Sequence, residues 1–200
     1  MCLRIGRKFN EFCSQVTICH NSLIWAKQIR YLGLHFIAGR TLKVNLNVAK
    51  RKFFISCNSI FSKISSHKAD LILPLVSSFG IPVLLYGLES VKLNKSELSR
   101  LSHPYTMVFH KIFGTYSKSI ISQCHFYTGN LPLDYLYKFR LLCFLKNLPN
   151  LSNNTCDYLY KMFGFDSFSL IASEFDIAEQ DTRGNIKHKV WSKFTASIDM

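Results

Sequence analysis

Acidic residues are scarce in this 200-residue sequence, which holds 12 Asp and Glu against 25 Lys and Arg. No two acids are adjacent, and the closest, Glu174/Asp176 and Glu179/Asp181, lie in the final fifty residues. Two-metal nucleotidyl transfer needs clustered carboxylates to hold its ions, so the sequence offers no convincing set for that chemistry. We interpret these four acids as solvated side chains rather than as a metal site.

Other signatures of enzymes and of secreted proteins are missing too. The sequence has no glycine-rich phosphate loop, no HExxH and no GxSxG. Its seven cysteines form no CxxC pair, which indicates reduced thiols in the cytoplasm or nucleus rather than a secreted disulfide framework. The gap between Cys13 and Cys19, with His20 beside them, does not match zinc-ligand spacing. No signal peptide is visible.

Positive charge is concentrated in residues 1–150. They hold 20 Lys and Arg against five acids, a net of +15, whereas residues 151–200 hold five against seven, a net of −2. A basic body of this kind suggests a polyanionic partner, either nucleic acid or an anionic membrane surface. A soluble surface that happens to be basic is the alternative interpretation.

One apolar run is long enough to be considered as a membrane span. Residues 71–88 carry no charge over eighteen residues, which just reaches the minimal length of a spanning helix. Pro74, Gly80 and Pro82 interrupt the run. We therefore favour a buried core helix, and a basic membrane-associated protein that inserts this run stays as an alternative.

The first forty residues are expected to form short β-strands. Strands are predicted at 3–5, 16–19 and 23–25, with a turn at Asn21-Ser22. Residues 29–37 are apolar on both faces apart from Arg30, which predicts either a strand buried on both sides or a tight hairpin. Gly33 within this segment predicts a bulge, a bend or the close approach of another backbone or a ligand.

From Asn45 onward the apolar residues follow a helical period. Helices are predicted at 45–64, 71–79 with a resumption at 81–88, 94–113 and 132–146. Asp70 is expected to cap the second of these, Asn94 and Glu97 to form a capping box, and Pro104 to kink or break the helix that follows.

These patterns predict an α+β fold that is mainly α. A small antiparallel β segment at about 2–38 is followed by a helical bundle at about 44–147. A weakly ordered tail completes the chain, with one helix expected at 155–163. The corresponding domains are 1–40, 41–148 and 149–200.

Five motifs follow one another in a fixed order. They are Ile29-Arg-Tyr-Leu-Gly33, Ala49-Lys-Arg-Lys-Phe53, Asn58-Ser-Ile-Phe-Ser-Lys63, Pro82-Val-Leu-Leu-Tyr-Gly-Leu-Glu89 and Leu93-Asn-Lys-Ser96. Their order and spacing resemble the reverse transcriptase of LINE-type (non-LTR) retrotransposons over roughly residues 2–146. The resemblance implies that residues 1–40 are a palm remnant with a primer-grip-like hairpin and that residues 41–148 are a helical thumb-like domain.

The resemblance also implies roles for seven residues. Those that match the hairpin supporting the primer end are Tyr31, Leu32 and Gly33. Those in the segment that matches the first thumb helix, where basic residues face the nucleic-acid backbone, are Lys50, Arg51, Lys52 and Lys63. Phosphate contacts of this type give salt-sensitive, sequence-independent affinity. The implied partner is an RNA–DNA template–primer or another nucleic acid.

The sequence departs from this family in what it lacks. The Tyr/Phe-x-Asp-Asp catalytic motif, the incoming-nucleotide motifs, the endonuclease domain and the Cys-Cys-His-Cys knuckle are absent. No cofactor is expected in this chain, and Mg²⁺ is expected only for the missing catalytic part. We therefore expect a fragment of an RNA-directed DNA polymerase that binds template–primer without catalysis on its own. The alternative is the C-terminal part of a complete endonuclease–reverse transcriptase with a truncated gene model.

Overall fold

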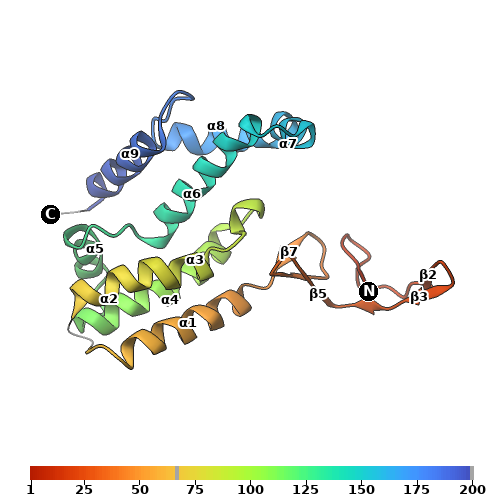
Figure 1. The fold of residues 1–200 in the computed structure, drawn as a ribbon, viewed down its shortest axis with the longest axis horizontal. Coiled ribbons are helices and arrows are strands. Elements are labelled where there is room, and N and C mark those ends of the chain that lie inside the picture. The colour runs from red at the N-terminus through yellow and green to blue at the C-terminus, as the bar shows by residue number, and fades with distance from the viewer. Residues whose placement is uncertain (66–67, 199–200) are drawn as a thin grey trace.

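The computed structural model describes residues 1–65 and 68–198. The fold is α+β and mainly α, as the sequence predicts. Figure 1 shows that the N-terminal strands reach away from the helices and that the helices form two groups, one central and one at the C-terminal end.

The N-terminal part, called here the β part, consists of short strands in three small sheets. Its strands are β1 (Cys2–Leu3), β2 (Val16–Ile18), β3 (Asn21–Leu23), β4 (Trp25–Ala26), β5 (Gln28–Tyr31), β6 (Leu34–Ile37) and β7 (Lys43–Val44). β1 pairs with β4 in parallel, β2 with β3 antiparallel, and β5, β6 and β7 form one antiparallel sheet in that order. The antiparallel segment is therefore confirmed except for the parallel β1–β4 pair and a parallel bridge between Ile5 and Gly39.

The segment 29–37 is a tight hairpin. Tyr31 of β5 pairs with Leu34 of β6, so the loop consists of Leu32 and Gly33, with φ of 46° and 82°. Positive φ at both loop positions is the type I′ pattern, whose twist matches that of paired strands. The hairpin alternative is confirmed. The alternative of a single strand buried on both faces is wrong, because the glycine reverses the chain and most of β5 is exposed.

The β2–β3 hairpin uses the same kind of loop. Cys19 and His20 have φ of 47° and 64°, and they separate the paired residues Ile18 and Asn21. The turn expected at Asn21-Ser22 is therefore wrong: these residues pair within β3, and the chain reverses just before them. Turn propensity predicted that a turn lies near these residues, but not which two residues form it.

The central group contains five helices that share one core. They are α1 (Leu46–Phe61), α2 (Ala69–Leu75), α3 (Ile81–Leu84), α4 (Lys95–Phe113) and α5 (Lys118–Tyr127). Phe53, Leu101 and Phe109 lie at the centre of this first hydrophobic cluster, with no exposed area. The sequence did not predict α5, whose buried face consists of only Ile121 and His125.

The apolar run 71–88 belongs to this core. α2 continues through a π-helical turn (Val76–Gly80) into α3, which ends at Leu84. A Cβ on Gly80 would lie 2.9 Å from the Phe53 ring, so the glycine lets this segment pack closely on α1. Within the described residues no helix combines the length and the apolar character needed to cross a membrane.

Helix caps agree with the sequence at α4 and differ at α2. The Asn94 side chain accepts a hydrogen bond from the Glu97 backbone N–H (2.8 Å), and the Glu97 carboxylate accepts one from the Asn94 N–H (3.0 Å). This confirms the capping box. The cap expected at Asp70 is wrong, because Lys68 occupies the N-cap and Asp70 lies in the first turn. A carboxylate in the first turn still interacts favourably with the positive end of the helix dipole.

Pro104 does not break the helix that contains it. α4 continues from Lys95 to Gly114, whose φ of 64° ends it in the left-handed conformation. Pro104 is itself buried, and Leu101 and Tyr105 beside it are buried in the first cluster. The prediction of a break is wrong because packing on both sides of the proline outweighs the one backbone hydrogen bond that it removes.

The tail is more regularly helical than the sequence predicts, and the helix expected at 155–163 is present. After α6 (Leu133–Asn147) the chain forms α7 (Asn154–Leu159), a π-helical turn (Tyr160–Gly164), α8 (Phe165–Glu174) and α9 (Arg183–Ala196). These helices bury a second hydrophobic cluster with Leu142 of α6 and with Ile186, Val190 and Phe194 at every fourth position of α9. This apolar stripe is narrow, and polar residues surround it, which hid it in the sequence. The division into three domains stays a prediction.

α6 connects the two groups of helices. Its Leu133 and Tyr137 lie in the first cluster, whereas Phe139 and Leu142 lie in the second. The Tyr137 hydroxyl donates to the Val91 carbonyl (3.1 Å). Figure 1 shows α6 running from the central group toward α7 and α8.

Candidate nucleic-acid interface

The tip of the β5–β6 hairpin lies against the chain that follows α3. Tyr31 and Leu32 are exposed, whereas Gly33 is half-buried. A Cβ on Gly33 would lie 3.0 Å from Cε1 of Tyr86, and a φ of 82° disfavours any residue with a side chain. The bend predicted at Gly33 is confirmed, because the chain reverses there. Gly33 is also closely approached, but by the Tyr86 ring rather than by another backbone or a ligand.

A second contact ties the hairpin to the same segment. Gly87 has a φ of 66°, and a Cβ there would lie 3.1 Å from Cδ1 of Leu34. Leu34 packs on the first hydrophobic cluster. Two adjacent positions after α3, Tyr86 and Gly87, therefore contact two consecutive residues of the hairpin, Gly33 and Leu34.

Hydrogen bonds join the base of the hairpin to the start of α1. The backbone N–H of Asn45, the N-cap of α1, donates to the His35 carbonyl (2.7 Å). The Gln28 amide nitrogen lies 2.7 Å from Nδ1 of His35, and the Asn45 amide donates to the Gln28 side-chain oxygen (3.2 Å). The direction of α1 is therefore fixed relative to the β5–β6 pair.

These contacts enclose a groove of about 440 Å³ between the β5–β6 hairpin, α1 and the α3 segment, called here the hairpin groove. Its walls are largely apolar, with side chains that include Leu34, Val44, Val48, Ala49, Val83 and Leu88. Arg30 of the hairpin and Lys52 of α1 also line it. The hairpin groove thus combines an apolar floor with two cationic side chains from different elements.

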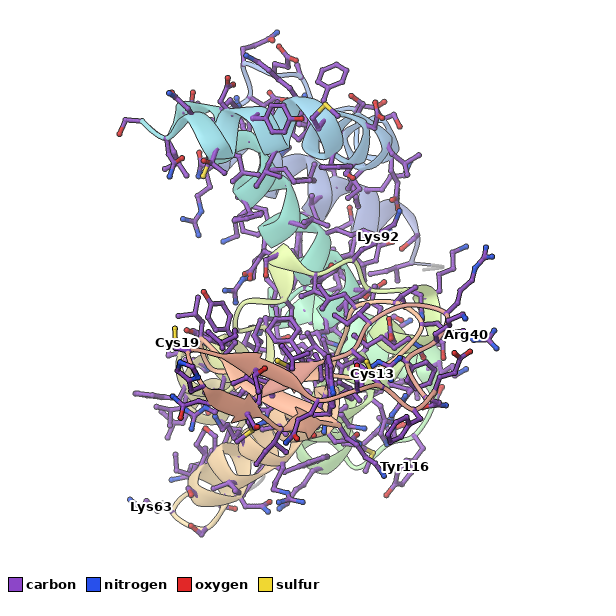
Figure 2. The ribbon with its side chains drawn as sticks, turned by 90° about the vertical axis from the view of Figure 1, so that its right-hand side faces the viewer. Cys13, Cys19, Arg40, Lys63, Lys92 and Tyr116 are labelled. Atoms are coloured by element: carbon purple, nitrogen blue, oxygen red, sulfur yellow. The ribbon has the colours of Figure 1, made fainter. Side chains whose placement is uncertain are left out.

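The structure sorts the four predicted basic residues by direction. Successive residues on a helix turn by about 100°, so Lys50, Arg51 and Lys52 point three different ways, and only Lys52 lines the hairpin groove. Lys63 lies two residues beyond the last residue of α1, so helix geometry does not fix its direction relative to Lys52. Figure 2 shows Lys63 at the far end of α1, away from the strands.

The positive charge near the hairpin groove has no compensation from nearby acids. Within residues 1–65 and 68–198, no ion pair involves Arg30, Arg51, Lys52 or Lys63. On the buried face of α1, burial raises the pKa of the Cys57 thiol to about 11, so this thiol stays protonated and is no nucleophile. Cationic side chains without acidic partners favour the approach of anions.

Two residues of the hairpin groove were not singled out from the sequence. Arg30 is the one charged residue of 29–37, but the sequence alone does not show that it lines the same groove as Lys52. Tyr86 lies inside the Pro82–Glu89 motif, where the sequence pattern predicts an aromatic residue of the core. Its exposed fraction of 57% and its place beside Gly33 show a surface role instead.

The cysteines and acids set aside earlier form no alternative site. Figure 2 shows Cys13 and Cys19 at separate places on the β part, and the described residues contain no group of three His, Cys, Asp or Glu side chains suited to a metal ion. The interpretation of the C-terminal acids as solvated is wrong for Asp181, which is buried and pairs with Lys189 (Nζ to Oδ2, 2.6 Å).

Comparison of the chain with protein-family models, curated proteins and solved structures gave no match. The resemblance to LINE-type reverse transcriptases therefore depends on the sequence motifs.

Proposed function

We propose that this chain binds nucleic acid along the hairpin groove and the adjoining face of α1. In this proposal it is a fragment of a LINE-type reverse transcriptase that holds a template–primer backbone without extending it. The observation that carries the proposal is that Arg30 and Lys52, 22 positions apart in two different motifs, line the same groove. The exposed hairpin tip, Tyr31-Leu32, stands beside them.

Spacing along α1 supports a contact with an extended polyanion. About 14 Å of helix separates Lys52 from the end of α1, and Lys63 lies two residues beyond that end. This length of helix corresponds to about four nucleotides of a duplex strand at 3.4 Å each. Lysine and arginine that neutralise phosphates release counterions, so the affinity depends on salt rather than on sequence. The shortage of acids in residues 1–150 leaves this attraction unopposed.

The proposal assigns no catalytic residue to this chain. Mg²⁺ and the carboxylates that bind it would belong to a catalytic part outside these 200 residues. If the chain is instead the C-terminal part of a complete enzyme, the hairpin groove serves the same purpose there. An in-frame Asp-Asp motif in the upstream genomic sequence would distinguish that alternative.

A matched pair of double variants tests the proposal. Arg30→Gln/Lys52→Gln removes two charges at the hairpin groove, and Lys187→Gln/Lys193→Gln removes two exposed charges of α9 in the other group of helices. With a fluorescent RNA–DNA primer duplex, we expect the first variant to bind at least about tenfold more weakly and the second to bind nearly as the wild type does. Equal losses in both would contradict the proposed site.

Primer extension provides a separate test of the non-catalytic role. The purified chain is incubated with the same duplex, Mg²⁺ and deoxynucleotides, and the primer length is measured on a denaturing gel. We expect no added nucleotide. Extension that depends on this chain would overturn the proposal of binding without catalysis.

A further inference from the structure

We infer that the hairpin groove takes one unpaired base of the bound strand, with the phosphate of that nucleotide held by Arg30 and Lys52. The inference rests on the proposed function in taking nucleic acid as the ligand, and it adds the part of the nucleic acid that enters. The ligand is therefore a nucleotide, in which a flat aromatic base is linked through a sugar to a phosphate.

The size of the hairpin groove favours a single nucleotide. Sites for small molecules usually measure about 300–1,000 Å³, and this groove measures about 440 Å³. A duplex cannot enter such a volume and can only pass across its mouth. What enters from a nucleic acid is therefore one base that has left its stack.

The walls of the hairpin groove also call for an apolar ligand body. A site for phosphate alone needs N–H and cationic donors, whereas here Val44, Val48 and Leu88 line much of the surface. Tyr86 adds an aromatic ring that is 57% exposed and held in place by the backbone of Gly33. Aromatic side chains that bind single strands stack on bases in this manner.

The polar groups of the hairpin groove are largely engaged already. The Asn45 side chain donates to Gln28 (3.2 Å) and accepts from the Asn47 backbone N–H (3.1 Å). Gln28 in turn contacts Nδ1 of His35 (2.7 Å). Few donors and acceptors are free to read the edge of a base, so we expect the groove to accept different bases with similar affinity.

Three small probes separate the parts of this ligand. We would titrate the full ¹⁵N- and methyl-labelled chain with AMP, adenosine and ribose 5-phosphate, and follow the resonances of Val44, Val48 and Val83 by NMR. We expect AMP to bind at least about fivefold more tightly than either fragment, because stacking and phosphate contacts both contribute. Equal binding of ribose 5-phosphate and AMP would overturn the inference, and so would the absence of shifts at these valines.

Two variants test the position of the base. Ala49→Leu places a larger side chain in the hairpin groove on a helix that tolerates leucine, and Tyr86→Leu removes the aromatic ring. We expect each to weaken AMP binding about fivefold or more, while Lys187→Gln on α9 leaves it unchanged. Thermal unfolding checks that the variants fold, and if one does not, the other decides. Unchanged AMP binding in a folded variant would contradict the inference.

The same samples distinguish this inference from the proposed function. Salt-dependent binding of the RNA–DNA duplex without binding of AMP would overturn the inference alone. Binding of AMP in the hairpin groove without binding of duplex would overturn the proposed function, and it would leave a mononucleotide site.

Discussion

The β part and the helical groups of this protein are held together in different ways. Among the described residues, every buried apolar side chain lies at or after Leu46, whereas the β part contributes only partly buried ones such as Leu34 and Val44. Phe12 is 99% exposed. The β part therefore has no core of its own, and the contacts of its hairpin with α1 and with Tyr86 give it its orientation. Elements with so little burial open locally at low free-energy cost.

The largest effect is expected from a substitution in the core of the helical groups. Phe53→Ala removes a side chain with no exposed area that packs against Gly80, and we expect it to lower the free energy of unfolding by about 3–5 kcal/mol. Phe12→Ala in the β part is the matched control and should cost less than about 0.5 kcal/mol. Urea denaturation followed by circular dichroism measures both. A comparable cost at Phe12 would mean that the β part has a core after all.

Acid should act on the helical groups through one buried histidine. His125 is 3% exposed, its Nδ1 lies 3.0 Å from the Asn130 carbonyl, and its ring lies 3.8 Å from that of Phe109. Burial lowers its pKa from 6.5 to about 4, and the hydrogen bond to Asn130 opposes this only in part.

The sign of this effect follows from the lowered pKa. Protonation favours the unfolded chain, so the contribution of His125 is complete above pH 6.5 and is lost as the pH falls toward 4. The loss amounts to about 3 kcal/mol. We expect the free energy of unfolding, measured between pH 7 and 4, to show this loss. We expect His125→Phe to reduce this pH dependence. His103→Phe, at an exposed histidine of α4, should not. Equal pH dependence in the wild type and in His125→Phe would contradict this assignment.

A smaller effect is expected at the β5–β6 hairpin loop, which packs against the chain that follows α3. Gly33→Ala forces a side chain into positive φ and toward the Tyr86 ring, so we expect the hairpin to lose about 1–2 kcal/mol. Leu32→Asn should stabilise it by up to about 1 kcal/mol, because Asn-Gly suits a type I′ loop. Amide exchange of Ala38, whose N–H donates to the Lys27 carbonyl, reports both changes.

Gly184→Ala is the control for this pair. Gly184 lies in the first turn of α9 without a positive φ, and a Cβ there would make only an ordinary van der Waals contact, 3.7 Å from the Thr182 hydroxyl, so alanine there should be neutral or mildly stabilising. If Gly33→Ala is as mild as Gly184→Ala, the contact between the hairpin tip and Tyr86 does not hold the hairpin.

The smallest expected effect separates neighbouring cations of α1. Lys52 lines the hairpin groove, and Lys50 points away from it. We expect Lys52→Gln to reduce the slope of log affinity against log salt for the duplex by about one, because one phosphate contact is lost. Lys50→Gln should leave the slope close to that of the wild type. The reverse order would place the nucleic acid on the other side of α1.

Local signals predicted much of this fold. The stripe of Phe53 and Cys57 on α1 and the capping box of Asn94 and Glu97 depend on residues a few positions apart, so they are legible in the sequence. Pro104 misled the prediction because local geometry disfavours it, while long-range packing decides in its favour. The α9 stripe was missed because only every fourth residue is apolar.

The candidate site was less accessible to sequence reasoning. The resemblance marked Gly33 and Lys52 separately, and the structure brings both into the hairpin groove. Arg30 and Tyr86 join them only through the packing of the hairpin on α3, a contact between residues about 55 positions apart. The local periodicity of a sequence does not predict a contact between residues so far apart.

The most direct test of the central claim is the binding of the purified wild-type chain to a labelled RNA–DNA primer duplex at 50 mM and 200 mM salt. We predict binding at the lower concentration that weakens about tenfold or more at the higher one, as expected when several phosphates are neutralised. Absence of binding by a folded, soluble sample at 50 mM salt would contradict the account, and so would an affinity that does not change with salt.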